Sequence, residues 1–365
     1  MPRLFGRQLT QAEIAARTGR ISQLGGIRPL RYDDGRARDV RAFDVRTGTG
    51  LQFTCVADRA LDIVSAEYRG IPLAWHAPAG LAAPAYYDGG RSGFARSFFG
   101  GLLTTCGLTA FGPPGEDQWG EWGQHGRINQ LPAEEVSSRT RWEDDSCVFE
   151  ISGTVRETRL FGEDLRLDRT WRAQLGSNRI ELVDRVINDG SASSPHMILY
   201  HCNIGFPLLA EDSRVYVSHR AVVPRDAEAR TGLDHWDRGA PPDPEFAEQV
   251  FTHEPVALDD GWAVAAMVAR HLNDERGLAL VIRFRPEELP ALFTWRMLGV
   301  KTYVMGLEPA NCPTILGRVA AAQQGVMPFI EPGEVRTYRL SFEVLEGRDE
   351  IDALVNAIGR APVAP

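Results

Sequence analysis

The chain has 365 residues, of which 43% are hydrophobic and 24% are charged, and its formal net charge is -9. This composition is typical of a globular protein with a sizeable core. The acidic balance, with no local run of Lys or Arg, argues against a nucleic-acid-binding surface. No stretch of about 18 uncharged apolar residues is present, which predicts no membrane span. The N-terminal residues lack the apolar core of a signal peptide. The five cysteines are scattered without a C-x-x-C pair, so we expect a cytoplasmic protein with reduced thiols.

The first 26 residues predict a peripheral helical arm. Thr10-Gln11-Ala12-Glu13 has the capping-box form, in which the Thr and Glu side chains each satisfy a backbone donor at a helix start. A short helix to about Thr18 should follow. The glycines at positions 19, 25 and 26 then punctuate the chain.

Strand-like patterns dominate residues 27–345. Val335–Val344 alternates apolar and polar residues most cleanly, and Thr47–Gly50 is a hairpin signal between two shorter runs. Residues 210–261 are charged and rich in proline, which favours loops. Many short strands separated by turns predict stacked antiparallel sheets, and hence an all-β domain over residues 27–345. Residues 346–365 should form a C-terminal helix, Asp349–Ile358, and a tail, so that helices are confined to the two ends of the chain.

Residues 77–132 combine many glycines and prolines with eight aromatic residues, Trp122 among them. Loops of this kind can place aromatic faces against sugar or base rings, or can pack over the end of a sheet. The sequence leaves both interpretations open.

Three places combine titratable groups with a loop or strand-end context. His125 precedes a glycine, which would let the backbone approach a ligand closely. His201 lies in apolar company, where a histidine is costly without a hydrogen-bond partner or a function; a satisfied core histidine is the alternative. Glu308 follows an apolar run, and Pro309 should end that strand. A carboxyl group among apolar neighbours should have a raised pKa, which suits a general base.

These motifs, in this order, resemble the galactose mutarotase-like, or aldose 1-epimerase, superfamily. The segments Tyr200–Gly205 and Gly306–Cys312 are similar in sequence to its DUF4432 branch, as are Phe99–Gly107 and Asp58–Asp62. The resemblance spans roughly residues 27–345. It implies a large antiparallel β-supersandwich with a sugar-binding cleft.

The resemblance also implies roles for three residues. Glu308 would take the proton from the anomeric hydroxyl, His201 would give one to the ring oxygen, and His125 would bind or polarise near that oxygen. Opening a cyclic hemiacetal needs a base at O1 and an acid at O5, so we expect the two to face each other across the sugar ring. The reaction requires no redox cofactor.

Further residues are candidates for substrate binding. The charged ones are numerous and indicate an acidic or modified sugar, because arginine pairs well with carboxylates; surface salt bridges are the alternative for each. The candidates are Arg59, Asp62, Arg96, Trp122, Arg127, Asn203 and Lys301.

Two other functions stay open at this point. An isomerase or epimerase could act at another sugar carbon with the same acid–base pair, and a metal-assisted version would use His125, His201 and Glu308 as ligands, although we assign no metal. A non-catalytic carbohydrate-binding or sensor protein is the alternative from a different class. The expected partner is a small carbohydrate, with no nucleic acid and no membrane, and a homodimer is left open.

Overall fold

Antiparallel sheets make up most of the computed structural model, which describes residues 1–361. Strands hold 46% of the residues and helices 13%, which confirms the predicted all-β class. No helix in the described part of the chain is long and apolar enough to cross a bilayer.

The largest sheet has eight strands, and its backbone-paired order is β13-β14-β15-β16-β27-β23-β22-β19. In that order the strands span Glu134–Glu143, Ser146–Thr158, Asp164–Gln174, Arg179–Asn188, Val335–Glu346, Leu278–Phe284, Ala263–Ala269 and Arg214–Val217.

A six-stranded sheet with the order β10-β18-β25-β24-β21-β20 carries the candidate site. Its strands span Thr104–Cys106, Leu199–Gly205, Thr302–Ala310, Ala291–Gly299, Gln249–Pro255 and His219–Pro224.

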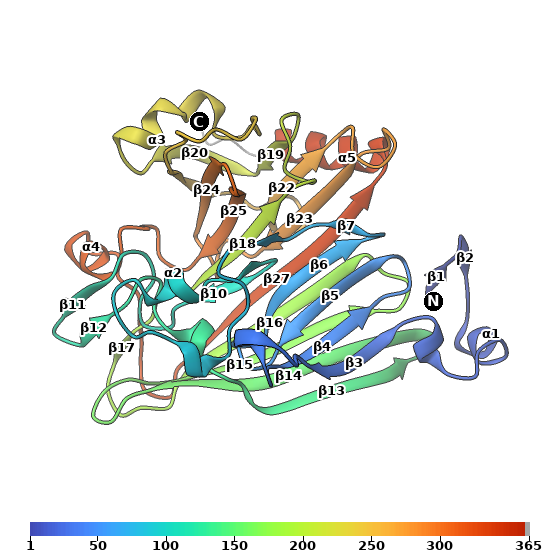
Figure 1. Ribbon diagram of the computed structural model, residues 1–365, viewed down its shortest axis with the longest axis horizontal. Helices are drawn as coiled ribbons and strands as arrows, with labels where there is room; N and C mark the ends of the chain where they lie inside the picture. Colours follow the sequence, from blue (N-terminus) through green and yellow to red (C-terminus); the bar gives the residue numbers. More distant parts are fainter. Residues whose placement is uncertain (362–365) are drawn as a thin grey trace.

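A five-stranded meander, β3 to β7, packs beside these two sheets, and it lies in front of them in Figure 1. Its strands span Gly26–Arg31, Arg41–Arg46, Leu51–Val56, Asp62–Tyr68 and Ile71–Pro72. Four two-stranded pairs complete the β structure: β1 with β2 (Arg3–Leu4, Arg7–Gln8), β8 with β9 (Trp75–His76, Gly100–Gly101), β11 with β12 (Gly115–Asp117, Gly120–Trp122) and β17 with β26 (Ser194–Pro195, Phe329–Ile330).

Alternation along the strands builds one main core between the sheets. In β15 every second residue is buried, including Leu167 and Trp171, and in β27 Leu340 and Phe342 face the same core. Because each such side chain contributes about 1.5–3 kcal/mol when fully buried, one sheet cannot slip by a residue without exposing its whole apolar face. The sheets therefore hold their side chains in a fixed register.

The terminal helices form as predicted. Thr10 caps α1 (Gln11–Ala15) with both hydrogen bonds of a capping box, and Ile14 joins the main core. Helix α5 (Arg348–Gly359) buries one face against β22 and β23. The tail from residue 362 lies outside the described residues. The division into residues 1–26, 27–345 and 346–365 stays a prediction, and helices α1 and α5 both pack onto the sheets.

The expectation that helices occur only at the ends was wrong. Three short helices lie in the connections, α2 (Gly93–Ser97), α3 (Ala227–Thr231) and α4 (Arg318–Gln323), as do the 3₁₀ turns Ile21–Gln23, Gly35–Ala37, Pro84–Tyr86, Ile128–Gln130 and Leu233–His235. The charged segment 210–261 also contains three strands, β19 to β21. Local composition favoured loops there, but pairing with β22 and β24 decided the structure.

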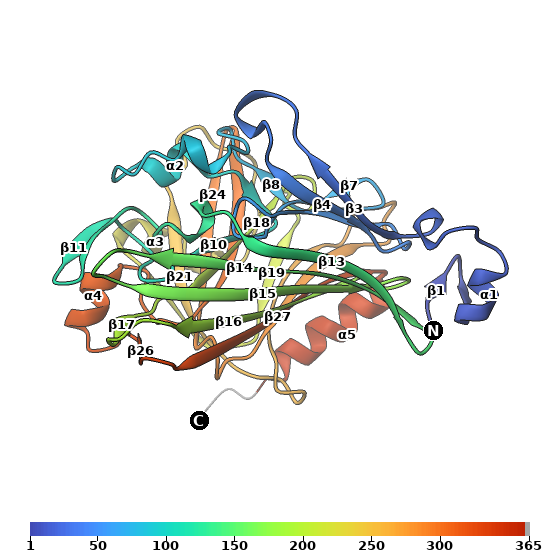
Figure 2. The same cartoon turned by 90° about the horizontal axis from the view of Figure 1, so that it is seen from below.

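The connections gather at one end of the molecule. Figures 1 and 2 both place α2, α4 and the β11–β12 hairpin at the end opposite α1. The loops at that end cover one face of the six-stranded sheet, which positions them over the candidate site.

Candidate active site

His201 and Glu308 are cross-strand neighbours. The β18–β25 register pairs Leu199 with Ala310 and Cys202 with Leu307, which places His201 opposite Glu308. Nε2 of His201 lies 3.3 Å from Oε1 of Glu308, and both side chains are buried. Contrary to expectation, Pro309 does not end the strand: β25 continues to Ala310, and Pro309 pairs with Leu292 of β24.

A glycine two residues before Glu308 makes room for its carboxylate. A Cβ on Gly306 would lie 2.3 Å from Oε1 of Glu308 and 3.1 Å from Cβ of Trp295. A side chain at position 306 would therefore displace the carboxylate, because non-bonded heavy atoms attract only at about 3.5–4 Å. The Gly-Leu-Glu sequence is a packing requirement of the site.

The end of the same motif fastens β18 to β25. The Asn311 side chain accepts a hydrogen bond from the Ile198 amide (2.8 Å) and donates to the His196 carbonyl (2.9 Å). These bonds clamp the chain just before β18, and so help to fix the register that brings His201 to Glu308.

Both residues open onto a cavity of about 790 Å³. Its floor is one face of the six-stranded sheet, and its walls come from the covering loops. The lining comprises Trp75, Ala77, Pro78, Ala79, Phe94, Ala95, Phe98, Gly112, Pro113, Pro114, Gln124, His125, His201, Arg225, Asp226, Glu248, Val250, Trp295, Thr302, Glu308, Ile315 and Leu316. A volume of this size with an aromatic lining and a few polar groups suits a small ligand. Another cavity, of about 720 Å³, lies against α5, and no histidine lines it.

His125 joins the pair from the loop side. Its ring centre lies 5.7 Å from that of His201, and Phe94 packs 4.8 Å from it. Gly126 is required by close packing, since a Cβ there would lie 2.4 Å from the Gly107 carbonyl oxygen. This close approach is to the protein's own backbone, not to a ligand as the sequence had led us to expect.

Aromatic rings enclose the imidazole of His201. Phe98 and Trp295 lie at ring-centre distances of 5.2 and 5.3 Å, and Trp75 lies 6.2 Å from Trp295. Such rings exclude water and offer apolar faces to a sugar.

The site holds polar atoms without partners. Nδ1 of His201, Oδ1 of Asn203 and Oε1 of Glu308 are buried and lack a hydrogen bond within the described residues. Each costs about 1–3 kcal/mol when left unsatisfied. The close contact between Glu308 and His201 therefore lacks hydrogen-bond geometry. Two of the three atoms belong to residues that line the cavity, although the atoms themselves are shielded from its surface.

Burial shifts both pKa values in opposite directions. It raises the pKa of Glu308 well above the usual carboxyl value, with Glu248 adding to the rise and Arg225 opposing it. Burial also lowers the pKa of His201, and His125 lowers it further. The pKa of His125 falls to about 4 through burial. Burial thus favours a protonated Glu308 beside neutral imidazoles.

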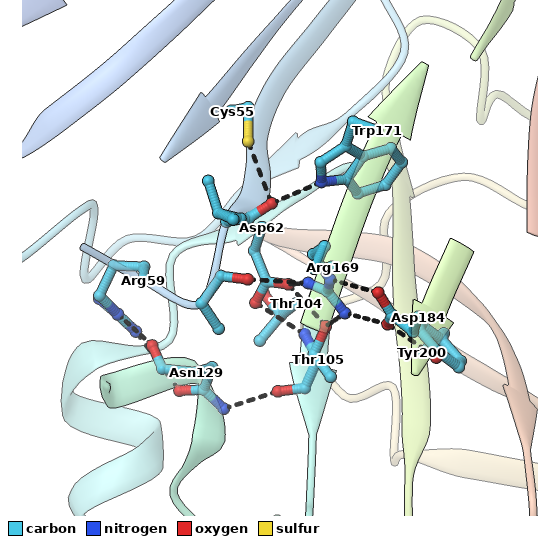
Figure 3. Close-up of polar contacts among 12 residues, drawn as sticks. Cys55, Arg59, Asp62, Thr104, Thr105, Asn129, Arg169, Trp171, Asp184 and Tyr200 are labelled. Carbon is cyan, nitrogen blue, oxygen red and sulfur yellow. Dashed lines mark hydrogen bonds and ion pairs between the residues drawn. The ribbon is translucent and has the colours of Figure 1, made fainter. Parts of the chain in front are cut away.

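Two predicted substrate-binding residues are structural. Arg59 is fully buried and donates to the carbonyls of Ala82 (2.9 Å) and Ser97 (3.0 Å), so it ties loops together. Asp62 accepts from Thr105 and pairs with Arg169 at 2.6 Å. Figure 3 shows both in a buried polar network that Asp184 and Tyr200 complete, and neither lines the cavity.

Three more predicted residues lie away from the cavity surface. Asn203 is buried behind it and donates to the carbonyls of Gly100, Gly101 and His201. Arg96 is exposed and lies 3.6 Å from Asp88. Lys301 occupies an exposed turn between β24 and β25.

Trp122 and Arg127 line a separate, adjoining cavity of about 350 Å³. Trp122 donates its indole N–H to the Pro113 carbonyl (3.1 Å), and the Arg318 guanidinium covers its ring at 4.0 Å. Arg127 is exposed at the same cavity.

The charged residues at the rim of the main cavity were not predicted from the sequence. Glu248 accepts from the indole N–H of Trp295 (2.9 Å) and from Arg225 (3.0 Å), and Asp226 holds the same arginine at 2.7 Å. These charged residues lie in the segment expected to be loop, where nothing local distinguishes them from a solvated surface. Trp295 could have been proposed from the sequence, because apolar and polar residues alternate on either side of it. In the structure it pairs with Gly306, so the two residues lie on the same face of the sheet.

The described residues contain no group of three His, Cys, Asp or Glu side chains arranged to hold a metal ion, and His125, His201 and Glu308 do not form one.

No curated protein matches this chain, but several solved structures share its fold. A putative aldose 1-epimerase from Klebsiella pneumoniae superposes with a TM-score of 0.85 at 23% identity, over 92% of this chain and 87% of that one. A galactose mutarotase-like protein from Clostridium acetobutylicum gives 0.60 at 13% identity (89% and 99%), and galactose 1-epimerase from Lactobacillus acidophilus gives 0.56 at 11% (89% and 100%). At these identities the likeness shows the fold alone. The model of DUF4432, a domain of unknown function, matches residues 37–344, and the chain therefore belongs to the DUF4432 family, with a galactose mutarotase-like fold.

Proposed function

We propose that the protein is an aldose 1-epimerase of the mutarotase type, which interconverts the anomers of a sugar by opening and closing its ring. The observation that carries the proposal is the His201–Glu308 contact of 3.3 Å, with unpaired polar atoms on both side chains, in a cavity lined by aromatic residues. The fold is that of proteins named as aldose 1-epimerases, which adds support.

The two groups approach the sugar from one side. A separation of 3.3 Å leaves no room for a ring between them, so our expectation that they face each other across the sugar does not fit this geometry. The chemistry does not require it, because O1 and O5 are both bonded to C1. Adjacent side chains can therefore reach the two oxygens together.

The pair can exchange protons without changing its total charge. In the reactive state Glu308 is ionised and His201 is protonated; Glu308 takes the proton of O1 while His201 gives one to O5, and the C1–O5 bond breaks. The aldehyde then lies beside a protonated Glu308 and a neutral His201. Burial favours this protonation state by raising the pKa of Glu308 and lowering that of His201. Rotation of the aldehyde and the reverse transfers close the ring on the other face of C1.

His125 acts as a neutral group. With its pKa lowered to about 4, its imidazole is uncharged near neutral pH, so it orients the substrate by hydrogen bonding. Because it lies beside His201, we assign it to the flank of the ring oxygen.

The charges of the cavity favour a neutral sugar over the acidic one suggested by the sequence. Of its lining residues, Asp226, Glu248 and Glu308 are carboxylates and Arg225 is the one arginine or lysine. That arginine is already paired with Asp226 and Glu248. A carboxylate on the substrate would meet like charge, whereas hydroxyl groups can donate to these oxygens.

A panel of free aldoses tests the proposal by exchange NMR, which measures anomer interconversion directly. Wild-type protein should accelerate at least one sugar, and Glu308→Gln should slow it by roughly 10²–10⁴, the usual contribution of a positioned acid or base. Glu254→Gln, an exposed residue of β21, is the matched control and should keep full activity. Sugar binding without acceleration would instead indicate a sensor.

A further inference from the structure

The smaller cavity directly adjoins the proposed catalytic one. Gly123 and Gly126 line the smaller cavity, whereas Gln124 and His125, between them in the chain, line the larger. The partition at this place is a single turn of backbone, in which His125 has a φ of 58°. A ligand that crosses it would touch both cavities.

The smaller cavity offers surfaces suited to a sugar ring. Tyr87 and Trp119 are half-buried and present aromatic surface, and Phe329 backs Trp119 at 5.5 Å. Trp122, covered by Arg318, forms its floor. Aromatic faces beside polar groups are a common arrangement for binding rings that carry both apolar C–H faces and hydroxyls.

Its charges are balanced. Three arginines and three glutamates line it: Arg127, Arg159, Arg318, Glu121, Glu157 and Glu163. Two of the arginines are occupied, Arg318 by Asp117 at 2.6 Å and Arg159 by Glu163 at 3.0 Å. A cavity with matched charges favours a neutral polyhydroxyl group over a phosphate, which would meet the glutamates as well.

Glu157 adds a buried polar wall. Its carboxylate accepts from the Leu108 amide (2.8 Å) and the Thr109 hydroxyl (2.9 Å), and only 2% of the residue is exposed. These bonds fix its oxygens in place. In contrast, the guanidinium of Arg127 forms no ion pair within residues 1–361, so it is available to a ligand.

We propose that this cavity is an accessory subsite for a second sugar ring, so that the protein takes reducing disaccharides as well as, or in preference to, monosaccharides. The inference rests on the proposed function, which places C1 of the reducing ring at Glu308 and His201. His125 lies at the flank of that ring and belongs to the partition, so a substituent on this flank of the ring lies toward Tyr87, Trp119 and Arg127.

The test compares an active monosaccharide with disaccharides that carry it at the reducing end; for glucose these are maltose, cellobiose, lactose and melibiose. Wild-type protein should give a kcat/KM for at least one disaccharide several-fold above that for the monosaccharide. Arg127→Gln and Trp119→Ala should each reduce the ratio of the two kcat/KM values several-fold. Arg139→Gln, an exposed arginine of β13, is the matched control and should leave the ratio unchanged.

The possible results of this test distinguish failure of the subsite from failure of the proposed reaction. An active monosaccharide with no gain for any disaccharide, or equal losses on both in the variants, overturns the subsite and leaves the function standing. A kcat/KM for glucose 6-phosphate above that for glucose, with no such increase for any disaccharide, also overturns the subsite. If no sugar is turned over, saturation-transfer NMR with the same disaccharides decides: contact of both rings, reduced to the reducing ring by Arg127→Gln, supports the subsite without the reaction. Contact of one ring, or of none, contradicts it.

Discussion

Oε1 of Glu308 lies 3.3 Å from Nε2 of His201, at the position where the β18–β25 register brings the two residues opposite each other. The contact depends on Gly306, whose missing side chain leaves the carboxylate its space. The proposed base and acid are thus held by two central strands, which positions them more rigidly than loops would.

The activity should have two pH limbs that belong to the pair and not to either residue. The reactive pair holds one proton in total. Acid adds a second as pH falls through the lowered pKa of His201, and alkali removes the shared one as pH rises through the raised pKa of Glu308. Activity should therefore be highest between these values. A profile of kcat/KM against pH measures it, and a single limb would contradict the shared proton.

Glu248→Gln should move the alkaline limb to lower pH. The Glu248 carboxylate raises the pKa of Glu308, so its removal lowers that pKa and the shared proton is lost earlier. Glu254→Gln provides the control, because Glu254 is exposed and pairs with Arg220. An alkaline limb that stays in place in the Glu248 variant would show that Glu248 does not act on Glu308.

Glu308→Gln should stabilise the protein at high pH relative to wild type. A carboxyl whose pKa is raised on folding contributes stability that is present below its unfolded pKa and is lost as pH rises through its folded pKa. Glutamine cannot ionise, so the variant avoids this loss. Melting temperatures across a pH series check the prediction, and a difference between the proteins that does not grow with pH would be inconsistent with a raised pKa.

Arg169→Met should destabilise the fold by about 3–5 kcal/mol, the usual cost of leaving buried charge uncompensated. Arg169 pairs at 2.6 Å with both Asp62 and Asp184, and all three side chains are fully buried (Figure 3). Urea unfolding measures the loss. Arg172→Met, the half-exposed neighbour on β15, should cost less than about 1 kcal/mol. Equal losses would mean that the buried network is not what Arg169 supports.

The sequence predicted the strands and the proposed catalytic residues better than it predicted the substrate contacts. Alternation located β27, predicted over Val335–Val344 and observed over Val335–Glu346, because its apolar residues face the core. It missed β20 and β21, whose pairing with neighbours overrides a charged composition. Glu308 and His201 were predicted together from motif order, although only the register shows that they touch.

The residues predicted to bind substrate do not line the main cavity, for a different reason. Arg59 and Asp62 are charged and close to a turn, which is also how a buried structural network appears in a sequence. Arg225 and Glu248 lie 23 residues apart and meet only at the cavity. A pattern along one chain cannot distinguish these cases, because partner identity depends on packing.

A double-mutant cycle on the anomer-exchange rate tests the central claim most directly. Glu308→Gln and His201→Asn should each slow exchange of the identified sugar by roughly 10²–10⁴, and the double variant should be about as slow as the slower single one, because residues that act as a unit are not additive. Sugar affinity should largely survive in all three. Near-full activity in Glu308→Gln, or losses that multiply in the double variant, would contradict a coupled acid–base pair.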